Sequence, residues 1–411
     1  MEEIENNEKT IYNCHVHIFT DEHVPELFVM MFFKRRMEWL ARRLMRLLKS
    51  KRVSNFAVRL GRLLSWIPFL DRLDQDLQST LERYKRLLDK GQLGDQAIIF
   101  DEVKDQYPPK TRFIVLPMNM EHMDLGNVQV GIDEQHAQLA RLARQDEYRD
   151  HLIPFFAVDP REEGIVKKVE DQFSGQDNVF RGIKIYPSLG YMPHDQKLMD
   201  IYKICVDKRI PVMSHCSTGG VWKFGLSEAQ RANYNHPRNY EIVLDKYPNL
   251  HLCLAHFGGG AEWRKHIGRK KPVKPANRAW VRWITDMIKS GKYPNLYTDV
   301  SYTIFENPGD NLQELSFFDY LNVLLTNERL QKRVLFGTDY YMVELEVMSE
   351  REVSTLLRSR LGNQLYFQIA NTNPERYLGI GREKTESRKK TPRRMRRKTR
   401  VKKIGIDRMA I

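Results

Sequence analysis

Two patterns of hydrophobic and polar positions alternate along most of the chain beyond residue 95. Short runs rich in β-branched and aromatic residues predict strands, and apolar residues every three or four positions predict helices between them. The predicted strands begin at or near residues 11, 112, 152, 182, 211, 250, 295 and 333. Strands alternating with helices indicate a parallel sheet, and eight such units close a (β/α)8 barrel. A doubly wound open sheet is the alternative, but no glycine-rich phosphate loop follows any predicted strand.

We therefore expect an α/β fold, a TIM barrel with a helical insertion after the first strand and a disordered basic C-terminal tail. The barrel domain is expected to span residues 1–381, with the insertion at 20–95 and the tail at 382–411. In the insertion, Phe33, Met37, Leu40 and Leu44 fall at helical spacing and make one apolar face. This face favours a lid or a subunit contact in a homo-oligomer, and a basic amphipathic helix lying on an anionic membrane is the alternative.

Charge is distributed unevenly along the chain. The formal net charge is +14, but residues 34–90 carry +10 and residues 382–411 carry +11, so the remainder carries −7. Peripheral contact with an anionic membrane or a nucleic acid is therefore expected only through the basic insertion and the tail. The tail has no aromatic residues for base stacking, so it is expected to tether the protein rather than to read a sequence.

The cellular location is predicted from the N-terminus, the apolar runs and the cysteines. The first eight residues are acidic and polar, unlike a secretory signal, and no apolar run approaches the length of a membrane span. The cysteines are scattered without a Cys-x-x-Cys pair, at Cys14, Cys205, Cys216 and Cys253. A reduced, cytoplasmic protein is expected, with peripheral membrane attachment as the alternative.

The clearest chemical signal is the pair His15 and His17 in the first predicted strand. Side chains at i and i+2 of a strand point to the same face, so both imidazoles can bind one divalent ion. Further polar residues end later strands: His215 the fifth, His256 the sixth and Asp339 the eighth. Each alone could be a core histidine or a helix cap, but the carboxyl ends of barrel strands are where catalytic groups gather.

Several motifs resemble those of the amidohydrolase superfamily, in the branch that includes aminocarboxymuconate-semialdehyde decarboxylase-like enzymes and pyrone-dicarboxylate lactonase-like hydrolases. They are His15-Val-His17, Gly182-Ile-Lys184, Ser214-His215, Leu254-Ala-His256-Phe-Gly-Gly and Phe336-Gly-Thr-Asp339. The terminal Asn373-Pro-Glu-Arg-Tyr-Leu-Gly is similar to the closing helix of that family. The resemblance covers residues 11–19 and about 97–380.

The resemblance implies that His15, His17, His215 and Asp339 hold one divalent metal ion, with zinc expected. An ion held by three histidines and a carboxylate keeps an open position and can activate water. Asp339 would then accept the proton of that water, and His256 would orient it or polarise a substrate carbonyl. Both are therefore the expected catalytic residues.

Three other residues are candidates for substrate binding. Lys184 occupies the place where some superfamily members carry a lysine that bridges two metals, and we expect it to bind substrate or to be structural. His236 and Trp222, on the loop after the fifth strand, are candidates for shaping a pocket for an anionic substrate. Asn13 stands where the superfamily usually has Asp, which puts in doubt a contact behind the first histidine rather than the metal itself.

The expected function is metal-dependent hydrolysis of a C–N or C–O bond, as in an amide or a lactone, in a small anionic molecule. Non-oxidative decarboxylation on the same metal site is the alternative. A third interpretation is a non-catalytic scaffold attached to membrane or nucleic acid by its basic segments. The intact set of predicted ligands argues against that third interpretation.

Overall fold

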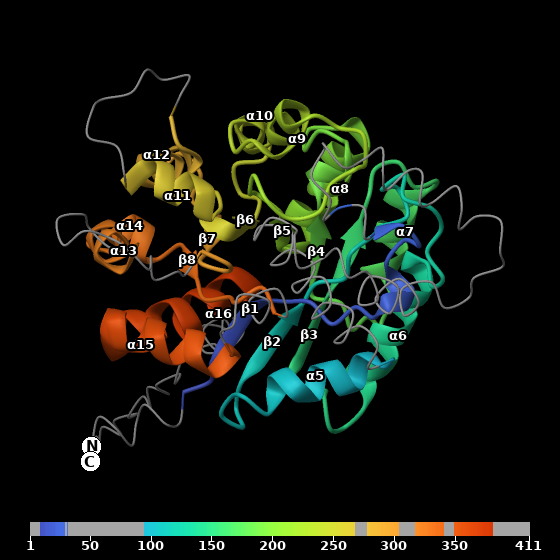
Figure 1. Ribbon diagram of the computed structural model, residues 1–411, viewed down its shortest axis with the longest axis horizontal. Coiled ribbons are helices and arrows are strands. Elements are labelled where there is room, and N and C mark those ends of the chain that lie inside the picture. Colours follow the sequence, from blue (N-terminus) through green and yellow to red (C-terminus); the bar gives the residue numbers. More distant parts are fainter. Residues whose placement is uncertain are drawn as a thin grey trace, which may run out of the picture.

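The computed structural model describes residues 9–28, 31, 94–267, 278–303, 317–340 and 349–380. Eight parallel strands form one sheet in chain order (Figure 1). They are β1 (Tyr12–Val16), β2 (Arg112–Val115), β3 (Leu152–Val158), β4 (Gly182–Ile185), β5 (Val212–Ser214), β6 (Leu252–Leu254), β7 (Leu296–Asp299) and β8 (Val334–Leu335). The sheet closes because the Cys14 N–H donates to the Phe336 carbonyl at 2.8 Å and the His17 N–H to the Tyr340 carbonyl at 2.7 Å. The predicted TIM barrel is confirmed, and the open-sheet alternative is wrong.

Helices surround the sheet (Figure 1). They are α5 (Gln96–Lys104), α6 (Ile132–Arg144), α7 (Ile165–Gln172), α8 (Gln196–Lys208), α9 (Glu228–Asn235), α10 (Asn239–Lys246), α11 (Gly260–Ile267), α12 (Trp280–Ser290), α13 (Phe317–Leu325), α14 (Glu328–Gln331), α15 (Glu350–Phe367) and α16 (Asn373–Leu378). Side-chain caps define several starts: Asp195, Ser227 and Ser349 each accept a backbone N–H of the first turn. The first of these helices, α5, ends at Lys104, several residues before the start of β2.

Two apolar layers hold the barrel together. Alternate strand residues point inward, and a small cluster that includes Cys14, Phe155 and Tyr297 fills the barrel. The intervening residues, such as Phe156, point outward and pack with the helices in the larger cluster. Because successive strand residues alternate in this way, each strand also has a fixed side chain that faces inward at its carboxyl end.

The first strand interrupts this alternation. Its pairing with β2 shifts register between Asn13 and Val16, as in a β-bulge. Tyr12 and Cys14 face the inner cluster, yet Val16 belongs to the outer one. The extra residue therefore lets His15, next to the inward Cys14, also face the barrel interior.

The predicted insertion at 20–95 and tail at 382–411 fall largely or wholly outside the described residues. The helices of the insertion, its role as lid or interface, and the attachment to membrane or nucleic acid stay predictions, as does the boundary at 381. Among the described helices, none combines the length and the apolar character needed to cross a membrane.

We predict that Gly182→Ala destabilises the barrel, because a Cβ at position 182 would lie 2.4 Å from Cζ of the fully buried Phe155. Overpacking of this kind costs about 2 kcal/mol of the free energy of unfolding, which urea denaturation measures. Gly175→Ala is the control, since its Cβ would meet nothing closer than 3.8 Å. Phe155→Leu should restore part of the lost stability in the Gly182→Ala background, and no recovery would contradict the steric explanation.

A second prediction concerns His136 of α6, which is buried against Phe156 at 3.9 Å between ring centroids. Its Nε2 accepts the Ala157 N–H at 2.9 Å, and burial lowers its pKa to about 3. A neutral buried histidine stabilises the fold above its ordinary pKa of 6.5, and this contribution is lost as pH falls towards 3. Between pH 7 and pH 5 we expect the wild type to lose about 2 kcal/mol more unfolding free energy than His136→Gln. Equal losses in urea titrations at the two pH values would contradict a neutral His136.

Candidate metal centre

Polar side chains meet inside the barrel at the carboxyl ends of its strands. Lys184 is the inward residue of β4, Asp299 ends β7, and His215 and His256 follow β5 and β6. His15 and His17 come from the bulged end of β1, and Asp339 lies four residues after the end of β8. All of these side chains are buried. The inward alternation of short parallel strands is what brings them to one place.

The backbone is strained at two of these positions. His256 has φ 63° and Asp339 has φ 66°, in the left-handed region that costs energy for residues other than glycine. Local hydrogen bonds stabilise both conformations: the His256 N–H donates to Asp299 Oδ1 at 2.9 Å, and the Asp339 N–H donates to the His15 carbonyl at 2.9 Å. Strain concentrated at these residues is typical of a functional site.

His17 and His15 both direct a ring nitrogen at the Asp339 carboxylate. His17 Nδ1 lies 2.7 Å from the Leu116 carbonyl, which can only accept, so Nδ1 carries the proton and Nε2 carries a lone pair. That Nε2 faces Asp339 Oδ1 at 3.3 Å. His15 Nδ1 is likewise paired with the Asp299 carboxylate at 3.1 Å, and its Nε2 lies 3.5 Å from Asp339 Oδ1. Electron pairs therefore face one another across both gaps.

His215 and His256 repeat the same arrangement. His215 Nε2 lies 3.0 Å from the Gly219 carbonyl, and His256 Nδ1 lies 3.2 Å from the Ser301 carbonyl, so both of these nitrogens donate. The remaining nitrogens, His215 Nδ1 and His256 Nε2, are 3.0 Å apart and both carry lone pairs in the neutral rings. The backbone of Gly220, in the loop after β5, lies close to the His215 ring. Its φ is +89°, and a Cβ at this position would lie only 2.8 Å from the ring, so a larger residue would not fit.

Three of the histidines, His15, His215 and His256, stay neutral at ordinary pH. Burial, and then the charge of Lys184, lowers the pKa of His15 well below its usual value. Burial lowers the pKa of His215, and the neighbouring His256 adds to the effect; burial also lowers the pKa of His256. Neutral imidazoles and an ionised carboxylate with facing lone pairs are a donor set that a divalent cation satisfies.

The geometry meets the requirement for a single ion. The ligand atoms of His15, His256 and Asp339 all lie within 4.8 Å of one another. These three residues can hold a divalent metal ion, and nitrogen and oxygen donors suit zinc, manganese and similar ions alike. The predicted ligands His17 and His215 lie beside this group, the first against Asp339 and the second against His256. Their direct ligation, and the choice of zinc, stay predictions.

Asp299 is a site residue that the sequence reasoning missed. Its carboxylate pairs with His15 Nδ1 and accepts the backbone N–H groups of His256 and Ser301. It thereby fixes the tautomer and the orientation of a ligand histidine, as carboxylates behind metal sites do. The signal was present, since Asp299 ends its strand at the same edge as Asp339.

The three predicted substrate residues lie in different surroundings. The Lys184 ammonium is buried 3.4 Å from His15 Nε2, inside the group. His236 instead packs on Trp280 and Trp283, with ring centroids 5.1 and 5.3 Å away, and none of the described contacts joins it to the group. Trp222 stacks under the Arg231 guanidinium at 3.9 Å. Roles of His236 and Trp222 in substrate binding stay predictions.

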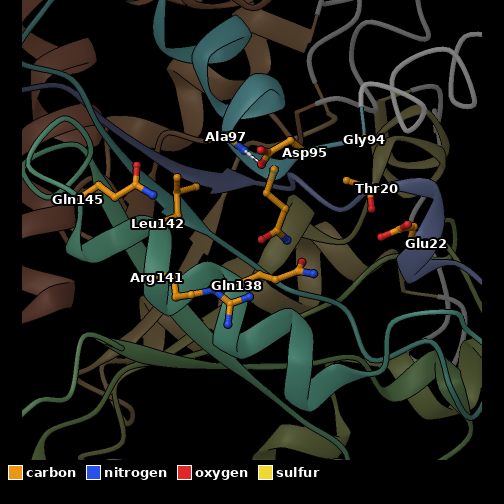
Figure 2. A pocket seen from close by; sticks show the side chains of 10 residues that line it. Thr20, Glu22, Gly94, Asp95, Ala97, Gln138, Arg141, Leu142 and Gln145 are labelled. Carbon is orange, nitrogen blue, oxygen red and sulfur yellow. Dashed lines mark hydrogen bonds between the residues drawn. The ribbon is translucent and has the colours of Figure 1, made fainter.

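A separate pocket lies on the outside of the barrel, between the start of α5 and α6 (Figure 2). Its volume is about 380 Å³, and its lining includes Thr20, Asp95, Gln138 and Arg141. It shares no residue with the metal-binding group.

Comparisons with known proteins bear on the family. A family model described as amidohydrolase matches residues 13–380. No curated protein matches the chain. Among solved structures, 5-carboxyvanillate decarboxylase from Novosphingobium aromaticivorans, complexed with manganese, is 13% identical, with 91% of this chain and 97% of that chain covered and a TM-score of 0.48.

Two further structures are similar at the same level. A probable 2-pyrone-4,6-dicarboxylic acid hydrolase from Acinetobacter baumannii is 9% identical, covering 90% of this chain and 99% of that chain, with a TM-score of 0.48. 4-Oxalomesaconate hydratase from Rhodopseudomonas palustris is 13% identical, covering 92% and 99%, with a TM-score of 0.48. These likenesses decide neither the reaction nor the metal.

We predict that the purified protein carries about one divalent ion per chain and that His15→Ala and Asp339→Ala lose it, because each substitution removes a donor from a three-residue group. Mass spectrometry of the metal content measures this. His256→Ala should also lower the ion content, and a loss in His215→Ala as complete as in His15→Ala would confirm the predicted ligation by His215. His151→Ala is the control, since its ring bonds the Thr111 carbonyl instead. A metal-free wild type after reconstitution would contradict the site.

Proposed function

The chain belongs to the amidohydrolase family, and we propose that it removes carbon dioxide from a small carboxylic acid in a metal-dependent, non-oxidative reaction. The observation that carries the proposal is a buried ammonium, Lys184, among buried ion-binding side chains. The sequence put hydrolysis first and decarboxylation second. The burial of the group reverses that order.

Lys184 supports an anionic substrate. Its side chain is 1% exposed, and although burial lowers its pKa to about 8, the carboxylates of Asp339 and Asp299 oppose that decrease. The residue is therefore mainly charged at neutral pH. A buried ammonium that can gain an anionic oxygen as a further partner binds it strongly, because little water competes for the charge.

Burial of the whole group supports decarboxylation. His15 is fully buried and Asp339 is 8% exposed, so a substrate carboxylate that enters this site loses most of its hydration. Loss of carbon dioxide disperses the negative charge that was desolvated, and a proton is the only other reactant. Hydrolysis must in addition admit and orient a water molecule.

The side chains then have distinct tasks. A divalent ion bound by this group would supply a positive charge that stabilises the electrons left behind on the substrate. Lys184 would hold an anionic oxygen and oppose the same developing charge. The C–C bond to the carboxylate breaks, its electron pair stays on the carbon, and carbon dioxide leaves. The Lys184 ammonium, whose pKa burial lowers to about 8, would deliver the proton that takes the place of the carboxylate.

Hydrolysis of an amide or a lactone is the second candidate, and the position of Asp339 favours it. Its Oδ1 lies 3.3 Å from His17 Nε2 and 3.5 Å from His15 Nε2, so the carboxylate borders the space where an ion and a water would meet. It could accept a proton from that water and pass it to the leaving group. Zinc remains the proposed ion for either reaction, and the proposed partner is a small carboxylic acid.

The test is a panel of small mono- and dicarboxylic acids, assayed for released carbon dioxide, beside matched amides and lactones assayed for hydrolysis in ¹⁸O-water. We expect carbon dioxide and a product with one carboxylate fewer. Incorporation of ¹⁸O without carbon dioxide would support the second candidate and contradict the first.

For whichever substrate turns over, we predict that Lys184→Met lowers kcat/KM about 100-fold, because it removes a buried charge that stabilises the transition state. The ion content should stay near the wild-type value. The exposed Lys203→Met is the control, since Lys203 pairs with Asp207 on the outside of the barrel. Unchanged turnover in Lys184→Met would contradict the role of the Lys184 ammonium, on which the proposal rests.

A further inference from the structure

We propose that Glu350 is a positioning residue for the metal centre, acting through Asn13 and Thr338 on the donors His15 and Asp339. The inference deepens the proposed function and rests on it. Glu350 is the first residue of α15 and lies behind the sheet rather than inside the barrel. It is fully buried.

The first step is the backbone of the bulge in β1. Where the register shifts, the N–H of His15 points at a side chain: it donates to Asn13 Oδ1 at 3.3 Å. The same Oδ1 accepts the Thr338 N–H at 3.2 Å. The Asn13 carboxamide oxygen therefore links the backbone of His15 to the backbone of Thr338, the residue before Asp339.

The second step is the orientation of that carboxamide. An amide can place either its oxygen or its NH₂ group towards the two N–H groups, and only the oxygen can accept them. Asn13 Nδ2 points the other way and donates to Thr338 Oγ1 at 2.8 Å and to Glu350 Oε2 at 3.2 Å. Glu350 Oε2 accepts the Asn13 NH₂ group, so Glu350 selects the orientation that the bulge requires.

The third step is the number of donors gathered on Glu350. Besides Asn13, the Thr338 hydroxyl donates to Oε2 at 2.7 Å and the Tyr107 hydroxyl at 2.9 Å. Tyr107 is itself buried, and both burial and Glu350 raise its pKa, so it remains a donor at any ordinary pH. Three donors from three parts of the chain meet one oxygen, which fixes Thr338 relative to Asn13.

The consequence reaches both metal donors. Asp339 follows Thr338 in a strained backbone conformation, and its N–H donates to the His15 carbonyl. A change at Glu350 therefore alters the distance between His15 and Asp339 without touching either side chain. Substitution of residues that orient metal ligands without binding the metal themselves lowers the affinity of the protein for the metal by about 10- to 100-fold.

The pair of Asn13 and Glu350 permits an exchange experiment. Asn13→Asp brings two carboxylates together, and Glu350→Gln leaves the Asn13 amide free to reverse. The double variant, Asn13→Asp with Glu350→Gln, restores one acceptor-only group and one amide in exchanged positions. Asn373→Asp is the matched control, because it places a carboxylate at a buried amide that donates to the Val334 and Gln331 carbonyls, away from the site.

The measurement is the affinity for Co²⁺ together with the visible absorption of the bound ion, at a temperature where circular dichroism shows every variant folded. We expect each single variant to raise the Kd about 10- to 100-fold and to shift the spectrum. The double variant should return to within about threefold of the wild type, which a merely structural role would not produce. Asn373→Asp should lose stability but keep the wild-type Kd and spectrum.

The outcomes separate the two proposals. Wild-type Kd and spectra in both single variants, or a double variant no better than the singles, would overturn the positioning role while leaving the metal site intact. A wild type that binds no Co²⁺, Zn²⁺ or Mn²⁺ would overturn the proposed function itself.

Discussion

The centre of this molecule depends on an electrostatic requirement: buried lone pairs that face one another need a cation between them. His15 and His17 both direct Nε2 at the Asp339 carboxylate, and the free nitrogens of His215 and His256 lie 3.0 Å apart. In each ring the other nitrogen is already bonded to a carbonyl or a carboxylate, so a change of tautomer would break that bond. The Lys184 ammonium, 3.4 Å from His15 Nε2, faces one of the four lone pairs. Repulsion between buried acceptors is costly because the surrounding protein screens it poorly. A divalent ion removes that cost, which is why the donor set indicates metal binding more strongly than distances alone.

To bring the donor side chains together, the backbone must depart from regular geometry at several points, and the first of these is in β1. In a regular strand Cys14 and His15 would point to opposite faces. The bulge between Asn13 and Val16 turns His15 inward beside Cys14, at the loss of a ladder bond for its N–H. Asn13 supplies the missing acceptor from the outer face of the same strand. The positive φ angles of His256 and Asp339 are comparable departures, each stabilised by a bond to another part of the centre.

Local patterns were sufficient to predict the barrel and most of its inward polar residues. Apolar runs between amphipathic helices predict eight parallel strands, and the polar residues at the ends of several runs are easily recognised. Asp299 was not recognised as a site residue, because a single aspartate at the end of a short strand can equally be the N-cap of a helix. The bulge could not be predicted, because the partner that stabilises it, Glu350, is 337 residues away from Asn13 in sequence. The packing of His236 on two tryptophans likewise depends on tertiary contacts that no local pattern encodes.

The same burial that organises the centre limits the chemistry it can perform. Lys184, Asp299 and Asp339 are charged groups kept inside the barrel, and folding must offset the hydration that they lose. Such charges cannot reorient with the substrate as water would, so they favour reactions whose charge develops where they already point. An anionic substrate that releases carbon dioxide and takes up a proton loses the charge that was costly to bury, whereas a hydrolytic substrate must share the site with water throughout. The fixed charges therefore favour a reaction that leaves the centre less polar than it began.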